Sequence, residues 1–387
     1  MKKIKYLSYY AHTDNNFQKR NVVLAAINKI DYICTVLNKA GYYVEMISAS
    51  STKDKEHCYK GFYKEIGHMR SLRLFFTFPW GNRIQKMLSF ISMRFFLLME
   101  LIELKKNEKF IVYHSLGYMR LVDFVHHIKK FHLILEVEEI YSDVDGDIKK
   151  RKKEVDFLKS ADGYIFSTEL LNQRINVEKK PYVVIYGTYQ VEQDRRCKFG
   201  DTQLQEKNVP VIHCVYAGTF DPRKGGAAAA IAAAAFLPSY YHVHILGFGN
   251  DSDIKNLKVL LMECANKYKC KVTFEGCLSG EEYIRFIQGC DIGLSTQNPN
   301  ADFNNTSFPS KILSYLGNGL RVVSIRIPVI ELSSIGKYMY YYDRQEPEEI
   351  AAAILKVDIK EPYDSRRAIM ELSDRFEREI ANMLKQS

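Results

Sequence analysis

The chain has 387 residues and a mass of 44.9 kDa, which is too long for one ordinary hydrophobic core and predicts two domains of about 150 to 200 residues. Hydrophobic residues make up 47% and charged residues 26%, a balance that excludes a disordered chain. The formal net charge of +9 suits anionic partners but selects none of them.

The eight cysteines are spread over both halves and form no C-x-x-C pair. This pattern predicts reduced thiols and argues against a disulfide framework or a cysteine-based zinc site. The first residues, Met1 to Ile4, carry charge, and no apolar signal region follows them. We therefore expect the protein in the cytoplasm.

The first half opens with a β-α-β pattern. A strand is expected at 5–10, an amphipathic helix at 21–40 and a second strand at 44–48. Such a unit predicts a parallel sheet with a ligand crevice at the strand ends. His12 lies in the loop after the first strand, either in that crevice or simply in solvent.

Residues 70–106 mix arginine and lysine with aromatic residues. From Ile84 to Ile102, apolar residues recur at three-four spacing, which predicts a long helix too interrupted by charge to span a bilayer. Two interpretations stay open. The helix forms a basic, aromatic surface for an anionic membrane, or it packs in the core of the first domain with its arginines in water.

Two further strands, 110–113 and 133–137, end in polar residues. His114 follows the first, and Glu138 and Glu139 follow the second, at positions where α/β crevices bind ligands. The acidic run 143–147 lacks the glycine position of a calcium loop and is interpreted as a solvated loop that leads into a basic helix at 149–159. More strands are expected near 161–168 and at 183–186, and the polar stretch 190–208 is the best linker.

The second half repeats a strand followed by a glycine turn. The strand near Val215 ends in Gly218 and Thr219, and Arg223, Lys224 and an alanine-rich helix follow it. A second strand leads into the turn with Gly247 and Gly249, and a third ends at Gly276. A short helix at 281–287 and a strand at 291–295 come next.

The stretch 306–323 reads as a polar turn, a helix from Ile312, an Asn-Gly turn and an apolar strand. Ser307, Ser310 and Lys311 would offer hydroxyls, backbone donors and an ammonium to a phosphate at the helix start. The alternative is an ordinary serine-capped helix.

Taken in order, residues 211–323 resemble the donor half of nucleotide-sugar glycosyltransferases of the GT-B fold, especially family-four-like enzymes of bacterial capsule or O-antigen polysaccharide synthesis. The resemblance implies an α/β protein of two Rossmann-like domains with an interdomain cleft. It implies an acceptor domain at 1–195, a donor domain at 196–365, and a C-terminal helix at 366–387 that crosses back to the first domain.

The resemblance also implies roles for the residues at the strand ends. Gly218, Thr219, Arg223, Lys224, Ser307, Ser310 and Lys311 would hold the diphosphate, Gly247 and Gly249 the nucleoside, and the segment around Phe274 and Gly276 the base. Glu138, Glu139 and His114 would contact the acceptor or act as general base. No metal and no cofactor are expected. The Gly-Phe-Gly at 247–249 lacks the third glycine of a dinucleotide fingerprint, which argues against a nicotinamide cofactor. The turn after Gly218 lacks the spacing of a Walker phosphate loop.

One departure bears on function. Where family-four enzymes often carry two glutamates, this chain has Thr306 and Ser314. We predict a metal-independent hexosyltransferase that moves a sugar from a nucleotide diphosphate to a glycan or lipid-linked acceptor, with peripheral contact to an anionic membrane. A nucleotide-sugar epimerase and a non-catalytic nucleotide-sugar-binding partner are the alternatives. Nucleic-acid binding is not expected, because no recognised motif supports it.

Overall fold

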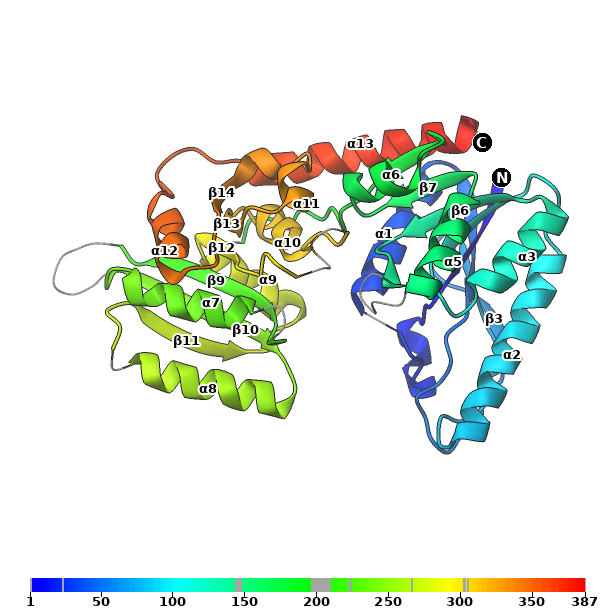
Figure 1. The fold of residues 1–387 in the computed structure, drawn as a ribbon, viewed down its shortest axis with the longest axis horizontal. Helices are drawn as coiled ribbons and strands as arrows, with labels where there is room; N and C mark the ends of the chain where they lie inside the picture. The colour runs from blue at the N-terminus through cyan, green and yellow to red at the C-terminus, as the bar shows by residue number, and fades with distance from the viewer. Residues whose placement is uncertain are drawn as a thin grey trace. The chain divides into compact units, whose positions relative to one another are not determined.

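The computed structural model describes residues 2–22, 24–142, 148–195, 210–222, 225–265, 267–301, 304 and 306–386. The chain forms two compact units, Met1–Thr188 with Asp374–Ser387 (unit 1) and Tyr189–Ser373 (unit 2). Each unit is built around its own sheet, and the ribbon of both is drawn in Figure 1.

The sheet of unit 1 has the strand order β3-β4-β2-β1-β5-β6-β7-β8, and every pairing is parallel except that of β3 with β4. Its strands are β1 (Lys2–Ser8), β2 (Tyr42–Ser48), β3 (Phe62–Glu65), β4 (Arg70–Leu74), β5 (Lys109–Tyr113), β6 (His132–Val137), β7 (Gly163–Phe166) and β8 (Tyr182–Val184). The central strands are apolar and buried on both faces, as parallel strands covered by helices must be.

The helices that connect these strands have the expected apolar stripes and caps. They are the short 3-10 helix η1 (Thr13–Gln18), α1 (Leu24–Lys39), α2 (Arg83–Ile102), α3 (Met119–Lys129), α5 (Ile148–Lys159) and α6 (Glu169–Ile175). Asn82 and Gln85 form a reciprocal capping box at the start of α2, and the Thr168 hydroxyl caps α6. In Figure 1, α2 and α3 lie side by side.

The sheet of unit 2 is entirely parallel, in the order β11-β10-β9-β12-β13-β14. Its strands are β9 (Ile212–Thr219), β10 (Tyr241–Phe248), β11 (Lys271–Gly276), β12 (Ile292–Ser295), β13 (Arg321–Ile325) and β14 (Met339–Tyr342). Its helices are α7 (Gly226–Ala233), η2 (Ala234–Phe236), α8 (Asp251–Ala265), α9 (Gly280–Gly289), α10 (Lys311–Gly317), α11 (Pro328–Glu331), η4 (Gly336–Tyr338) and α12 (Pro347–Leu355).

The last helix, α13 (Ser365–Gln386), drawn red in Figure 1, begins in unit 2 and belongs to unit 1 from Asp374 onward. Its apolar stripe is buried, and Phe376 stacks against Tyr32 of α1 at a ring separation of 6.0 Å. The Lys109 ammonium donates to the Leu384 carbonyl at 2.6 Å. The C-terminal helix therefore completes the core of the first unit, as the sequence predicts.

The helix α2 bears on both of its sequence interpretations. Only one stripe of it is buried, namely Ser89, Met93, Leu97, Glu100 and Leu101. The periodic apolar residues that predict the helix, including Ile84, Met87, Ile91 and Phe95, are instead more than half exposed. The helix therefore packs in unit 1 through Met93, Leu97 and Leu101, as the second interpretation expects, while the other apolar residues lie on the surface.

Among the described residues, no helix is long and apolar enough to cross a membrane.

Candidate functional site

The carboxyl ends of β9 and β10 meet at two glycines. Gly218 and Gly247 are register partners in the parallel pair. Gly247 has a φ of 144°, and a Cβ built on it would lie 1.7 Å from the Gly218 carbonyl oxygen. No side chain fits there, because the Gly218 backbone occupies that space, and both glycines are partly exposed.

The Lys311 side chain reaches the same edge from the start of α10. Its Nζ lies 3.9 Å from the centre of the Tyr216 ring, and a Cβ on Gly218 would lie 3.0 Å from that Nζ. Burial raises the pKa of Tyr216 to about 12, so its ring is a neutral platform for the ammonium. The structure thus brings Lys311 and Gly218 together, as the sequence predicts for a diphosphate site.

The position of α10 is fixed by a buried tyrosine. Tyr315 is fully buried, and its hydroxyl oxygen accepts a hydrogen bond of 2.7 Å from the backbone N–H of Ala217, next to Gly218. Ser310, just before the helix, is exposed, and Ser307 is partly exposed. Both hydroxyls therefore stay available near Lys311.

The start of α7 is held against the same tyrosine ring. A Cβ on Gly226 would lie 2.7 Å from Tyr216 Cε2, and the Gly226 carbonyl accepts from the Thr296 hydroxyl at 2.7 Å. The Gln345 amide in turn donates to the Thr296 carbonyl at 2.7 Å. Arg223 and Lys224, predicted to carry charge into this helix, lie outside the described residues.

The residues predicted for the nucleoside side gather around Phe220. A Cβ on Gly249 would lie 3.1 Å from Phe220 Cβ, and the Phe274 ring contacts the Phe220 ring edge-on at 5.7 Å. Gly276 has a φ of 79° and open space where a side chain would be. Phe220 is buried and Phe274 is partly exposed, so Phe274 is the more accessible of the two rings.

The two positions that replace the expected glutamates offer no carboxylate. Thr306 is buried. The Ser314 hydroxyl lies 3.0 Å from the Tyr283 hydroxyl. Whatever contacts a sugar or ribose here must do so without these two acids.

The strand ends of unit 1 border a pocket of about 360 Å³ with a largely aromatic wall. Tyr9 follows β1, Tyr113 ends β5, and Ser115 and Tyr141 come just after β5 and β6. Trp80, Phe90 and Met93 close it from α2 and the loop before it. A cavity of this size and composition accepts a small ligand that has both apolar faces and hydroxyls.

The three predicted acceptor residues lie near this pocket in different environments. Glu138 is 28% exposed and pairs with Lys29 at 2.5 Å, and Glu139 is partly exposed. His114 is 1% exposed and stacks against Tyr141, and burial lowers its pKa to about 4. Glu138 is therefore partly accessible from solvent, whereas the buried His114 packs behind the Tyr141 ring that lines the pocket.

Two other residues have structural roles. His12 caps η1, its Nδ1 accepting from the Asp14 backbone N–H at 3.4 Å. Glu154 of α5 is buried and accepts from the backbone N–H groups of Tyr141 and Ser142 at 2.8 and 2.9 Å. Residues 143–147 themselves lie outside the described residues.

Sequence reasoning missed the aromatic lining of the pocket. Tyr9, Trp80 and Tyr141 are far apart along the chain and meet only in the folded unit. A usable signal was present, because Ser115 and Tyr141 each lie within three residues of a named candidate, and Trp80 is the single tryptophan.

No family model matches the chain, and no curated protein matches its sequence. Solved structures do match its whole length. A sucrose-phosphate synthase from Thermosynechococcus elongatus superposes with a TM-score of 0.69 at 13% identity, covering 100% of this chain and 99% of the other. HepE from Anabaena in complex with UDP and glucose gives 0.63 at 13%, covering 100% of both chains.

A third structure, of an Escherichia coli trehalose-6-phosphate protein bound with UDP-2-fluoro glucose, gives a TM-score of 0.67 at 11% identity and covers 100% of this chain and 99% of the other. The chain has the GT-B fold. At these identities the likeness establishes the GT-B architecture of two parallel-sheet domains. What this GT-B chain binds has to be argued from its own residues.

Proposed function

We propose that the protein is a glycosyltransferase that moves a sugar from a nucleotide-diphosphate donor to a glycan or lipid-linked acceptor in cell-surface polysaccharide synthesis. The observation that carries the proposal is the convergence of Gly218, Gly247 and Lys311 at one sheet edge. Two of the matched GT-B structures hold UDP or a UDP-sugar, which supports the same ligand class here.

Donor chemistry follows from that edge. When the bond between the anomeric carbon and the diphosphate oxygen breaks, the leaving nucleotide gains negative charge. The Lys311 ammonium and the backbone N–H groups around Gly218 and Thr219 would stabilise it, with Ser307 and Ser310 as further donors. Gly247, Gly249, Phe274 and Gly276 would face the nucleoside, and Arg223 and Lys224 would add charge. We propose that this transfer needs no metal ion.

The acceptor is assigned to the pocket of unit 1. Its tyrosines and Trp80 offer faces for a sugar ring, and Ser115 offers a hydroxyl. Glu138 is the proposed base that takes the acceptor hydroxyl proton as that oxygen bonds to the anomeric carbon, with Glu139 as its neighbour. The acceptor domain proposed at 1–195 corresponds to unit 1, whose first segment ends at Thr188, and the donor domain proposed at 196–365 corresponds to unit 2, Tyr189–Ser373. Of the returning helix proposed at 366–387, the part from Asp374 belongs to unit 1.

The exposed side of α2 suggests how an acceptor with an apolar tail arrives. Its surface stripe, defined as Ile84, Met87, Leu88, Ile91, Phe95, Met99 and Ile102, is between 36 and 66% exposed. Phe124 and Ile128 of the adjacent α3 are also exposed. A patch this apolar marks an interaction surface rather than scattered exposure.

Cations accompany the surface stripe. Arg83 and Lys86 are exposed at the start of α2, and the Arg94 guanidinium lies 4.3 Å from the centre of the Phe90 ring. Apolar side chains flanked by cations suit an anionic lipid surface. Since Phe90 and Met93 of the same helix line the pocket, we propose peripheral binding at the cytoplasmic face of a membrane beside a lipid-linked acceptor.

Transfer assays over a panel of nucleotide sugars test the function. Lys311→Ala should lower kcat/KM by about 100-fold or more, because one charge-stabilising donor is lost at the leaving group. Lys258→Ala, on the exposed side of α8, is the matched control and should leave it unchanged. Wild-type kinetics in the Lys311 variant would remove the site assignment.

The same assays separate two other functions. Binding of a nucleotide sugar without turnover would identify a non-catalytic partner, which the absence of carboxylates at Thr306 and Ser314 favours. Interconversion of the donor sugar without an acceptor would identify an epimerase.

Flotation with liposomes tests the membrane surface. The double variant Ile91→Glu with Phe95→Glu should lose binding to vesicles that contain anionic lipid, while Met262→Glu, at a 72% exposed position on α8, should not. Equal flotation of both variants, or none by the wild type, would end this part of the proposal.

A further inference from the structure

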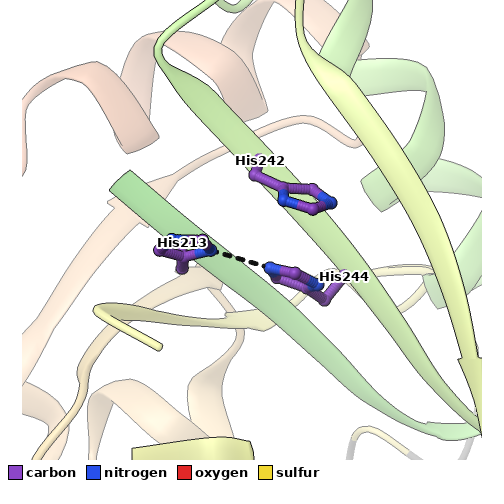
Figure 2. A group of neighbouring side chains, drawn as sticks. All are labelled: His213, His242 and His244. Atoms are coloured by element: carbon purple, nitrogen blue, oxygen red, sulfur yellow. Dashed lines mark hydrogen bonds between the residues drawn. The ribbon is translucent and has the colours of Figure 1, made fainter. Parts of the chain in front are cut away.

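Three histidines of unit 2 gather on one face of its sheet, away from the glycine edge. His213 of β9 is the register partner of His242 of β10, and His244 lies two residues further along the same strand. One ring nitrogen of each lies within 4.8 Å of those of the other two. Figure 2 shows the three rings on the same side of the two strands.

These three are all the histidines between residues 189 and 373 of the sequence. His213 and His244 are buried, and His242 is partly exposed. Burial keeps the rings of His213 and His244 away from water, and the charged form of an imidazole is disfavoured in such surroundings. Neutral imidazole is the form that binds a metal ion.

The hydrogen bonds on the side of β11 set the tautomer of His244. Glu275 of β11 faces the His244 ring, and a carboxylate accepts hydrogen bonds. His244 Nδ1–H therefore donates to Glu275 Oε1, at 2.8 Å. His244 Nε2 is then the acceptor of the hydrogen bond from His213 Nδ1–H, at 2.9 Å, which is the dashed line of Figure 2.

The same carboxylate sets His242 through a threonine. The Thr273 hydroxyl donates to Glu275, so its oxygen accepts from His242 Nε2–H at 2.8 Å. The lone pair of His242 is then on Nδ1. Two histidines thus have one nitrogen anchored by a carboxylate, directly or through a hydroxyl, which is the arrangement that orients imidazoles around protein metal sites.

We propose that His213, His242 and His244 bind one divalent transition-metal ion of the zinc class, with Glu275 and Thr273 orienting the ligands. Three imidazoles with water in a fourth position form a known coordination set for Zn²⁺. Two ligand nitrogens about 2.0 to 2.1 Å from a tetrahedral ion are about 3.3 Å apart. The ion would therefore replace the 2.9 Å hydrogen bond between His213 and His244 and draw together nitrogens that now lie within 4.8 Å of one another. His213 keeps its proton by carrying it on Nε2.

The site is separate from the proposed donor edge and does not depend on it. His242 is the second residue of β10, whereas Gly247 lies near its other end. The ion would cross-link β9 and β10 and, through Glu275, hold β11. It stabilises unit 2 and takes no part in the proposed transfer.

The test is calorimetric titration of the full chain, without a histidine tag and stripped with EDTA. Zn²⁺ should bind one ion per chain and raise Tm, whereas Mg²⁺ should do neither, because it prefers oxygen ligands. His242→Gln keeps a donor for Thr273 and should weaken Zn²⁺ binding at least tenfold. His57→Gln, at a mostly exposed histidine of unit 1, should not. No saturable binding by the wild type, or unchanged binding in His242→Gln, would overturn the site.

A visible absorption spectrum of the wild type with Co²⁺ tests the site without a variant, so the result does not depend on whether a variant folds. Nitrogen and water ligands around the ion should give visible bands without a thiolate charge-transfer band. A thiolate band would put the ion on a cysteine such as Cys290 instead and would also overturn the proposal.

Discussion

The two sheets are both largely parallel, but their strands end in different kinds of residue. In unit 2 the edge is made of Gly218 and Gly247, with side chains withdrawn and one ammonium, that of Lys311, close to the backbone. In unit 1 the corresponding edge carries Tyr113, Tyr141 and other aromatic side chains around a cavity. Parallel β/α order brings strand ends together, and the residues there decide whether backbone donors or aromatic faces meet the ligand.

The largest effect is expected from filling the glycine edge. Gly247→Ala would place a Cβ 1.7 Å from the Gly218 oxygen at a φ of 144°, so it should cost about 4 kcal/mol or more of the stability of unit 2. Gly280→Ala, at a φ of 55° with open space around it, should cost only about 1 kcal/mol. Chemical denaturation measures both. Equal costs would show that the backbone conformation at position 247, and not the contact with the Gly218 oxygen, is what requires glycine there.

A smaller effect is expected in the aromatic pocket. Trp80→Ala should raise the acceptor KM about tenfold, equal to about 1.4 kcal/mol, and leave the donor KM unchanged. Trp80→Phe keeps an aromatic face and should lie close to the wild type. If the alanine variant alters donor KM instead, the assignment of acceptor to unit 1 and donor to unit 2 is reversed.

The smallest effect is expected in the pH dependence of stability, from the buried carboxyl of Glu136. Burial, with Glu138 nearby, raises the pKa of Glu136 to about 8, and the Tyr6 hydroxyl donates to its carboxyl. The folded chain thus keeps a proton that the unfolded chain, with an ordinary carboxyl pKa, has released. Stability contributed here is present at low pH and falls as pH rises toward 8.

Glu136→Gln should remove this dependence. Between pH 6 and 7 the wild type should lose about 1 kcal/mol relative to the variant. Urea denaturation at a series of pH values measures the difference, and a constant difference across the series would show that Glu136 is ionised in the folded protein.

Much of the fold could be predicted because the sequence repeats strands that end at glycine or polar residues and helices with apolar stripes. The ends of β5, β6, β9 and β10 lie within a few residues of the predicted positions. The strands β3 and β4 were not predicted. β3 is mostly exposed, and β4 carries Arg70 and Arg73, so neither has a local apolar pattern, and both depend on pairing with β2.

The sites were less accessible to sequence reasoning. Lys311 and Gly218 could be matched because each follows a recognisable turn. The pocket wall and the histidine cluster could not, since Trp80 and Tyr141 meet only in the folded unit, and His213 and His244 become neighbours only through sheet register. One local sign existed for the cluster: His242 and His244 are two residues apart in a strand and so share a face.

The central claim is that a nucleotide diphosphate binds where β9, β10 and α10 of unit 2 meet. Crystals of the full chain soaked with UDP test it most directly. The account predicts the diphosphate within hydrogen-bond distance of Lys311 Nζ and of backbone N–H groups beside Gly218. A diphosphate bound elsewhere, with Lys311 still seated on Tyr216 and nothing at Gly218, would contradict it.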